Sequence, residues 1–103
     1  MTDRELAEKI VAFGVGSSSG DLYSLDGFSY DSQKEQGFVR DWRVAGAMIE
    51  KCLDEGFVFD IGQKVRILST EIAISISESL PRAINEACVE ALSTDGEGQE
   101  FGN

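Results

Sequence analysis

Candidate nucleophiles in this chain are the two cysteines, Cys52 and Cys88, and the serine run Ser17–Ser19. A catalytic serine or cysteine is normally activated by a neighbouring base, most often a histidine, and this sequence has no histidine. Both cysteines fall on apolar helical stripes, whereas a reactive thiol needs a partly exposed, electropositive setting. Adjacent carboxylates such as Asp54 and Glu55 diverge on a helix and form no acid–base pair. We therefore expect no enzymatic activity and no catalytic residues.

The same residue types argue against a metal or cofactor site. Cys52 and Cys88 lie far apart, with no C-x-x-C motif and no histidine to complete a zinc site. In a reducing compartment, two buried free thiols are the expected state, with a disulfide or a metal pair as the lesser alternative. No metal and no cofactor is predicted.

An acidic excess is the most pronounced chemical property of the chain. Nineteen Asp and Glu residues face nine Lys and Arg residues, for a net charge of −10. Phosphate binding needs clustered Lys and Arg, which are scattered here, so direct nucleic-acid binding is not expected. Acidic surfaces can instead occupy protein grooves lined with Lys and Arg, although plain solubility is the more frequent use of such charge. The candidate partner-binding residues are Asp3, Glu5, Glu8, Asp21, Asp26, Asp31, Glu50, Asp54 and Glu55.

A second hypothesis is that the protein sequesters a small molecule such as a nucleotide signal. Residues 14–20, GVGSSSG, read as a flexible loop, and they lack the preceding strand and following Lys of a phosphate cradle. Arg and aromatic side chains together suit a phosphate and a base, although the overall charge would repel an anion. The candidate ligand-binding residues are Tyr23, Tyr30, Arg40 and Arg43.

Three segments that could position these residues have the periodicity of amphipathic helices. They run from about Asp3 to Phe13, from about Val39 to Asp54, and from Leu80 to Leu92. On the second helix, Trp42 is predicted to anchor the core, so that its truncation to alanine would cost about 3–5 kcal/mol. Gly46 is predicted to let this helix approach a sheet closely.

Helix boundaries are marked by capping residues. Thr2 and Glu5 have the T-x-x-E spacing of a capping box, and Ser79 is a suitable N-cap for the last helix. Gly14 and Gly56 are suited to end the first and second helices.

The remaining segments read as strands and connectors. An Asp-Gly turn predicts a small hairpin within Leu22–Tyr30, and the polar stretch Asp31–Gly37 reads as a connector. Alternating patterns at Phe57–Ile61, Lys64–Leu68 and Glu71–Ser77, with short connections, predict an antiparallel meander. The last of these strands is rich in alternating isoleucine and could pair two copies of the chain as a homodimer if it lies at a sheet edge.

Together these elements predict one α+β domain over residues 1–93, followed by a flexible polar tail over 94–103. The expected architecture is a layered α/β/α sandwich with a small antiparallel β-meander and about three helices. Apolar runs are too short to cross a membrane, and the amino terminus lacks a signal-peptide layout. We expect a cytoplasmic protein that does not bind membranes.

Two motifs resemble those of the phage ABA-sandwich domain family. They are DWRVAGAMIEKC, residues 41–52, and SLPRAINEA, which starts at Ser79; the resemblance extends over about Arg4 to Leu92. It implies an α-β-α sandwich encoded by a phage or prophage, acting in the host bacterial cytoplasm, and it supplies no catalytic residues. The implied role is that of a phage accessory protein. Together with the net charge of −10, it leads to the hypothesis of an acidic inhibitor of a host nucleic-acid-handling or defence complex, as anti-CRISPR proteins are. A virion or morphogenesis component is the further alternative.

Overall fold

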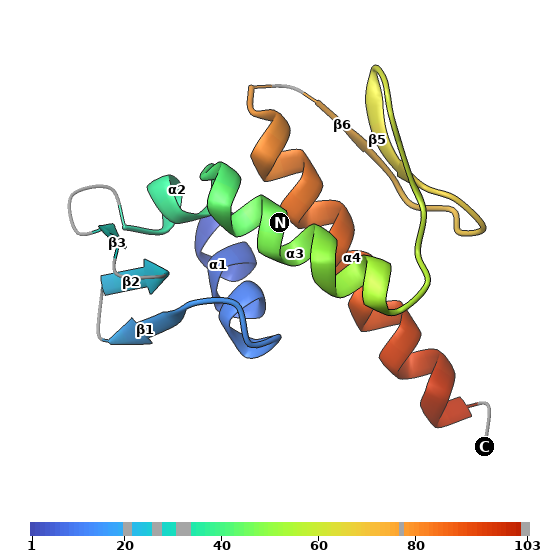
Figure 1. Cartoon of the computed structure of the whole chain (residues 1–103), viewed down its shortest axis with the longest axis horizontal. Coiled ribbons are helices and arrows are strands. Elements are labelled where there is room, and N and C mark those ends of the chain that lie inside the picture. Colours follow the sequence, from blue (N-terminus) through green and yellow to red (C-terminus); the bar gives the residue numbers. More distant parts are fainter. Residues whose placement is uncertain (20–21, 26–27, 31–33, 77, 102–103) are drawn as a thin grey trace.

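Helices occupy the middle of the molecule, and small sheets lie at either side of them (Figure 1). The computed structural model describes residues 1–19, 22–25, 28–30, 34–76 and 78–101. The described helices are α1 (Asp3–Ala12), α2 (Lys34–Val39), α3 (Trp42–Asp54) and α4 (Leu80–Phe101). The described strands are β1 (Ser17–Ser19), β2 (Leu22–Leu25), β3 (Phe28–Tyr30), β4 (Phe59–Ile61), β5 (Lys64–Ile67) and β6 (Ala73–Ser75).

The protein has the expected α+β fold, with helices layered against a small antiparallel meander. Strands β4, β5 and β6 form the meander in that order, and β5 and β6 pack on α4. Strands β1, β2 and β3 form a second antiparallel sheet, which contacts α2. Helix α4 also packs on α1 and α3, so the helical layer joins the two sheets (Figure 1).

Alternation along the meander turns its apolar side chains toward the helices. Val65 and Ile67 of β5 are buried, whereas Lys64 and Arg66 between them are exposed. Ile74 pairs with Val65 and therefore lies on the same, inward face. The predicted meander is confirmed, with each strand shorter than its apolar pattern. Strand β6 lies at an edge of the sheet, which is where it would have to lie to pair with β6 of a second copy. The homodimer itself stays a prediction.

The amino-terminal third differs from the sequence-based expectation in two places. Ser17–Ser19, expected in a flexible loop, forms β1, which pairs with β2 in register so that Ser17 Oγ and Ser24 Oγ lie 3.0 Å apart. Lys34–Val39, expected partly as a polar connector, forms α2. The cause is tertiary, because Phe38 of α2 is fully buried and its ring lies 5.2 Å from that of Tyr23.

Helix α3 is rotated about its axis relative to the prediction, which turned Trp42 toward the core. It begins at Trp42, with the Asp41 side chain accepting a hydrogen bond from the Arg43 amide at 2.7 Å. Its buried stripe is Val44, Ala45, Met48 and Cys52. The prediction that Trp42 anchors the core is wrong, since Trp42 is 59% exposed.

The role predicted for Gly46 is also wrong. Gly46 is exposed, and, apart from its two chain neighbours and the backbone of its own helix, no atom of the described residues lies within 4 Å of the position that a Cβ would take. The residue therefore brings α3 close to no other described element. Gly14 and Gly56 do end their helices as predicted, with φ of 91° and 90°.

Helix α4 is the most enclosed element of the fold. Ser79 Oγ accepts a hydrogen bond from the Arg82 amide at 3.2 Å, which confirms the predicted N-cap. The helix continues to Phe101, beyond the expected end at Leu92, and so includes most of the stretch expected as a flexible tail. Neither α4 nor any other helix in the described part of the chain has the length and apolar character needed to cross a membrane.

Candidate protein-docking surface

Asp3 and Arg40, which the sequence assigned to two different sites, bind each other. Arg40 Nη1 donates to Asp3 Oδ2 at 2.8 Å, and Arg82 Nε donates to Asp3 Oδ1 at 2.7 Å. Arg40 also pairs with Glu78, and Arg82 pairs with Glu86 at 2.8 Å. The network fastens the start of α1 to the α2–α3 junction and to the first turns of α4. Asp3 and Arg40 therefore have a structural role.

The electrostatics of this network favour its charged form. Burial raises the pKa of Asp3, but hydrogen bonds and charges from Arg82 and Arg40 outweigh it, and the pKa ends below its ordinary value. The hydrogen bond to Asp3 raises the pKa of Arg40, against a smaller opposing effect of burial. The network is thus ionised across the physiological pH range.

Other predicted acids on α1 are exposed and separate from α3. Glu5 bonds to the predicted N-cap Thr2, with the Glu5 amide donating to Thr2 Oγ1 at 3.1 Å and Thr2 Oγ1 donating to Glu5 Oε1 at 3.2 Å. Glu8 lies 4.0 Å from Arg4, and both side chains are exposed. The predicted residues Asp21, Asp26 and Asp31 lie outside the described residues.

The described side chains among the predicted ligand-binding residues, those of Tyr23, Arg40 and Arg43, have contacts within the fold. Tyr23 is buried on Phe38, and Tyr30 pairs with Tyr23 across β2 and β3. Arg43 is held by Asp41, with its Nε 3.0 Å from Oδ1 and its Nη2 2.7 Å from Oδ2. Hollows of about 300 to 550 Å³ in the described part of the chain are lined by other residues.

A hollow of about 550 Å³ lies between α1, β6 and α4. Its lining includes Met1, which carries the amino-terminal ammonium group, Lys9, and the two carboxylate residues Glu71 and Glu90. The two positive and two negative groups balance, so the hollow has no excess of positive charge that would attract an anionic ligand such as a nucleotide. This hollow gives no support to nucleotide sequestration.

The two cysteines lie where α3 and α4 pack together, and both are fully buried as expected. Cys52 Sγ lies 3.9 Å from the carbonyl oxygen of Cys88. Interaction with Cys88 lowers the pKa of the Cys52 thiol, and interaction with Cys52 together with burial raises the pKa of the Cys88 thiol. Over the residues that the structure describes, no cluster of Cys, Asp and Glu side chains has the arrangement of a metal site.

An exposed apolar face on α3 is the feature that the sequence reading missed. Trp42 and Leu53 are 59% and 54% exposed, Gly46 is exposed, and Ile49 is half-buried. These four residues follow the spacing i, i+4, i+7 and i+11, which places them in one row along the helix. The available signals in the sequence were Asp41, a suitable N-cap that places Trp42 in the first turn of the helix, and Gly46, for which no core contact accounts.

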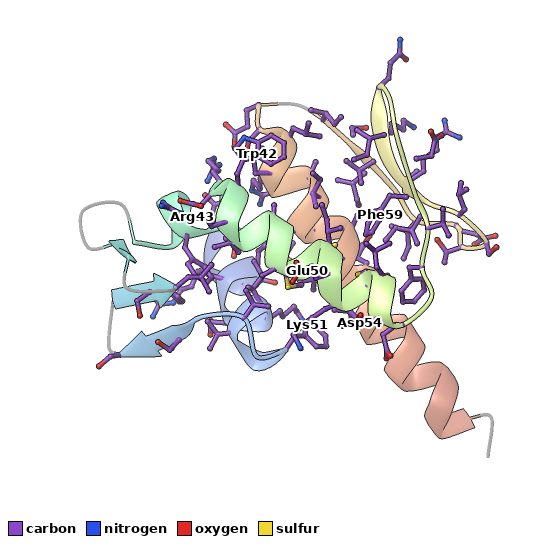
Figure 2. The ribbon with its side chains drawn as sticks, in the orientation of Figure 1. Trp42, Arg43, Glu50, Lys51, Asp54 and Phe59 are labelled. Carbon is purple, nitrogen blue, oxygen red and sulfur yellow. The ribbon has the colours of Figure 1, made fainter. Side chains whose placement is uncertain are left out.

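Three carboxylates lie beside this row. Glu50 and Asp54 are one turn apart, and Glu55 caps the end of α3; all three are exposed. Figure 2 shows Trp42 at the amino-terminal end of α3, Asp54 at the other end, and Glu50 between them. Among the described residues, no ion pair within 4.0 Å joins these acids to a cation. We call Trp42, Gly46, Ile49, Leu53, Glu50, Asp54 and Glu55 the α3 face.

The α3 face has the composition of a protein-docking surface. Exposed Trp residues are enriched at the energetic centres of protein interfaces, and charge at the rim steers and selects the partner. No protein-family model, curated protein or solved structure significantly matches this chain. The resemblance to phage ABA-sandwich domains therefore stays a prediction from the motifs. The α3 face is the structural feature that bears on function.

Proposed function

We propose that the protein acts by binding a host protein or complex with a basic surface, as a phage-encoded inhibitor of nucleic-acid handling or defence. The observation that supports this most is the α3 face, where exposed Trp42 shares the helix surface with Glu50 and Asp54, two carboxylates that no ion pair joins to a cation among the described residues. The net charge of −10 extends the same preference over the whole molecule. An anti-CRISPR-like mode of action fits this combination.

Charge explains how such a protein would inhibit. Grooves that bind nucleic acid are lined with Lys and Arg, and their positive potential attracts any acidic surface of suitable shape. A protein carrying clustered carboxylates competes with phosphate for those side chains. Apolar contact through Trp42 then adds affinity that salt does not screen.

The α3 face also argues for a protein partner over the alternatives. Nucleic acid and nucleotides are anions, which Glu50, Asp54 and Glu55 would repel. An exposed apolar row that includes a tryptophan packs favourably on another apolar surface, which a protein supplies. Nothing in the described residues favours a virion role over this one.

Capture from bacterial lysate tests the proposal. The purified protein is used as bait at low and high salt, after nuclease treatment, and retained proteins are identified by mass spectrometry. We expect a basic nucleic-acid-binding complex at low salt and its loss at high salt, because salt screens exposed charges. The captured complex should also lose its binding to DNA or RNA when the protein is added in excess.

A charge-matched pair of variants makes the test specific. Neutralising the α3 face with Glu50→Gln, Asp54→Asn and Glu55→Gln should abolish capture. The control neutralises three acids that are neither on the α3 face nor among the predicted partner-binding residues, with Asp60→Asn, Glu71→Gln and Glu90→Gln, and should retain capture. Equal capture by both triple variants would contradict the proposal. Absence of any partner, together with a rise in melting temperature on adding nucleotides, would favour the sequestration alternative.

A further inference from the structure

The apolar row of the α3 face has the geometry of a helix-packing surface. Trp42, Gly46, Ile49 and Leu53 recur at alternating steps of four and three residues, the spacing that packs one helix against another. From Trp42 to Leu53 the row extends about 16 Å along the axis, at the 1.5 Å rise of an α-helix. The row is therefore long enough to contact about three turns of a second helix.

Gly46 is the second observation. A glycine inside a helix lowers stability by about 1 kcal/mol relative to alanine, and nothing within the described fold benefits from it. Space lies open around the position of its missing Cβ, in the middle of the apolar row. Small residues at such a position allow the backbone of another helix to approach closely.

Charge defines the chemistry of the occupant. Glu50 and Asp54 lie along one side of the apolar row, and Glu55 lies at its end. Arg43, the basic residue on the outward side of α3, is already bound by both carboxylate oxygens of Asp41. A helix placed on the row therefore meets negative charge along this side, which matches Lys and Arg at the flank of its own apolar stripe.

We propose that the α3 face is the docking site for an amphipathic, basic α-helix of the partner protein. The helix packs its apolar stripe on Trp42, Ile49 and Leu53, crosses close to Gly46, and places Lys or Arg against Glu50 and Asp54. This inference rests on the proposed function, because it names the part of the basic partner that is recognised.

Trp42 provides a direct readout, since it is the single tryptophan of the chain. The probe is a blocked synthetic peptide of about 18 residues, made of Leu, Ala, Lys and Arg with apolar residues at helical spacing. Two comparison peptides carry the same composition in scrambled order, or Glu in place of Lys and Arg. Docking of the basic amphipathic peptide should move the Trp42 emission to shorter wavelength in a saturable way, because it removes the indole from water.

Two variants of small exposed helical residues form the matched pair. Gly46→Gln places a long side chain in the row, and we expect it to weaken peptide binding by about tenfold or more. The control Ala12→Gln adds the same side chain to an exposed position on α1 and should leave binding unchanged. Gly46→Gln should at the same time raise the melting temperature, because glutamine is a better helix former than glycine. Reduced binding thus cannot be assigned to unfolding.

Several outcomes would overturn the inference. Equal binding of the scrambled peptide would mean that charge alone is recognised, and unchanged binding by Gly46→Gln would mean that no helix crosses there. A failure of the amphipathic peptide to shift the emission would exclude the site. An emission shift that depends on protein concentration without peptide would mean that a second copy covers the face.

The inference and the proposed function fail separately. If lysate capture depends on Glu50, Asp54 and Glu55 but is the same for wild type and Gly46→Gln, the partner is basic and is not held as a packed helix. If the triple variant that neutralises Glu50, Asp54 and Glu55 also leaves capture unchanged, both the inference and the proposed function fail.

Discussion

Helices α3 and α4 have similar amphipathic sequences and opposite positions in the fold. Helix α4 contacts α1, α2, α3 and two strands of the meander, and buries residues over most of its circumference between Pro81 and Ala91. Helix α3 buries one stripe and leaves Trp42, Gly46 and Leu53 in water. The apolar content of the two sequences therefore did not distinguish α4, which packs on most of the fold, from α3, which presents an exposed apolar row.

The two helices also treat polar groups differently. Asn85 of α4 is fully buried and its amide donates to the carbonyl oxygen of Val39 at 2.9 Å. Glu50 and Asp54 of α3 point to solvent with no ion-pair partner among the described residues. Polar groups on α4 are thus part of the fold, and those on α3 remain available to a partner.

The largest effect is expected from truncation on α4. Ile84→Ala should lower the free energy of unfolding by about 3 kcal/mol, because Ile84 is 1% exposed and its loss leaves a cavity. The matched control Ile61→Ala, at a residue 45% exposed, should cost about 1 kcal/mol or less. Urea unfolding measures both, and equal costs would mean that α4 is not the centre of the core.

Next in size is the ion network at the start of α4. Asp3→Asn should cost about 2 kcal/mol, because Arg40 and Arg82 lose their shared carboxylate. The exposed control Glu8→Gln should change stability by about 0.5 kcal/mol or less.

The same network makes the free energy of unfolding depend on pH in the acid range. The pKa of Asp3 is lowered from 3.8, so its contribution is complete above that pH and is lost as pH falls through the lower, folded-state pKa. Wild type should therefore lose stability more steeply than Asp3→Asn below about pH 4. Parallel pH profiles of the two proteins in urea unfolding would contradict this assignment.

A smaller effect of opposite sign is expected at the centre of the α3 face. Gly46→Ala should raise the free energy of unfolding by about 1 kcal/mol, since the added methyl group meets no atom within 4 Å. Gly16→Ala gives the contrast, because Gly16 has φ of 73° and its Cβ would lie 2.6 Å from the carbonyl oxygen of Ser24. Thermal unfolding that shows destabilisation by Gly46→Ala would mean that this face is part of the core.

The smallest effect on stability is expected from Trp42→Ala, within about 0.5 kcal/mol. The gain in helix propensity offsets the partial packing that the indole loses. This value replaces the 3–5 kcal/mol that a core tryptophan would cost. Differential scanning calorimetry measures it, and a loss of several kcal/mol would return Trp42 to the core and remove the basis for the α3 face.

Local signals predicted the elements whose formation depends on near neighbours. The Thr2 cap on the Glu5 amide, the Ser79 cap and the alternation along β5 are all present in the structure. Each is a contact or periodicity within a few residues, so the chain itself specifies it.

Elements that depend on distant contacts were not predicted. Helix α2 forms because Phe38 is buried against Tyr23, and the rotation of α3 about its axis is set by its packing on α4. The apolar pattern of α3 fits two overlapping stripes, one through Val44 and Met48 and one through Trp42 and Leu53. Packing on α4 buries the first stripe, and the second stripe remains exposed as the candidate site.

The place of α4 in the chain has a consequence for biosynthesis. Helix α1 is made first and α4 last among the described elements, yet Arg82 binds both Asp3 and the carbonyl oxygen of Met1. While a ribosome is still adding residues before Leu80, α1, α3 and the meander have no common surface on which to assemble. The nascent chain thus completes its fold in a late step, when the first turns of α4 leave the exit tunnel.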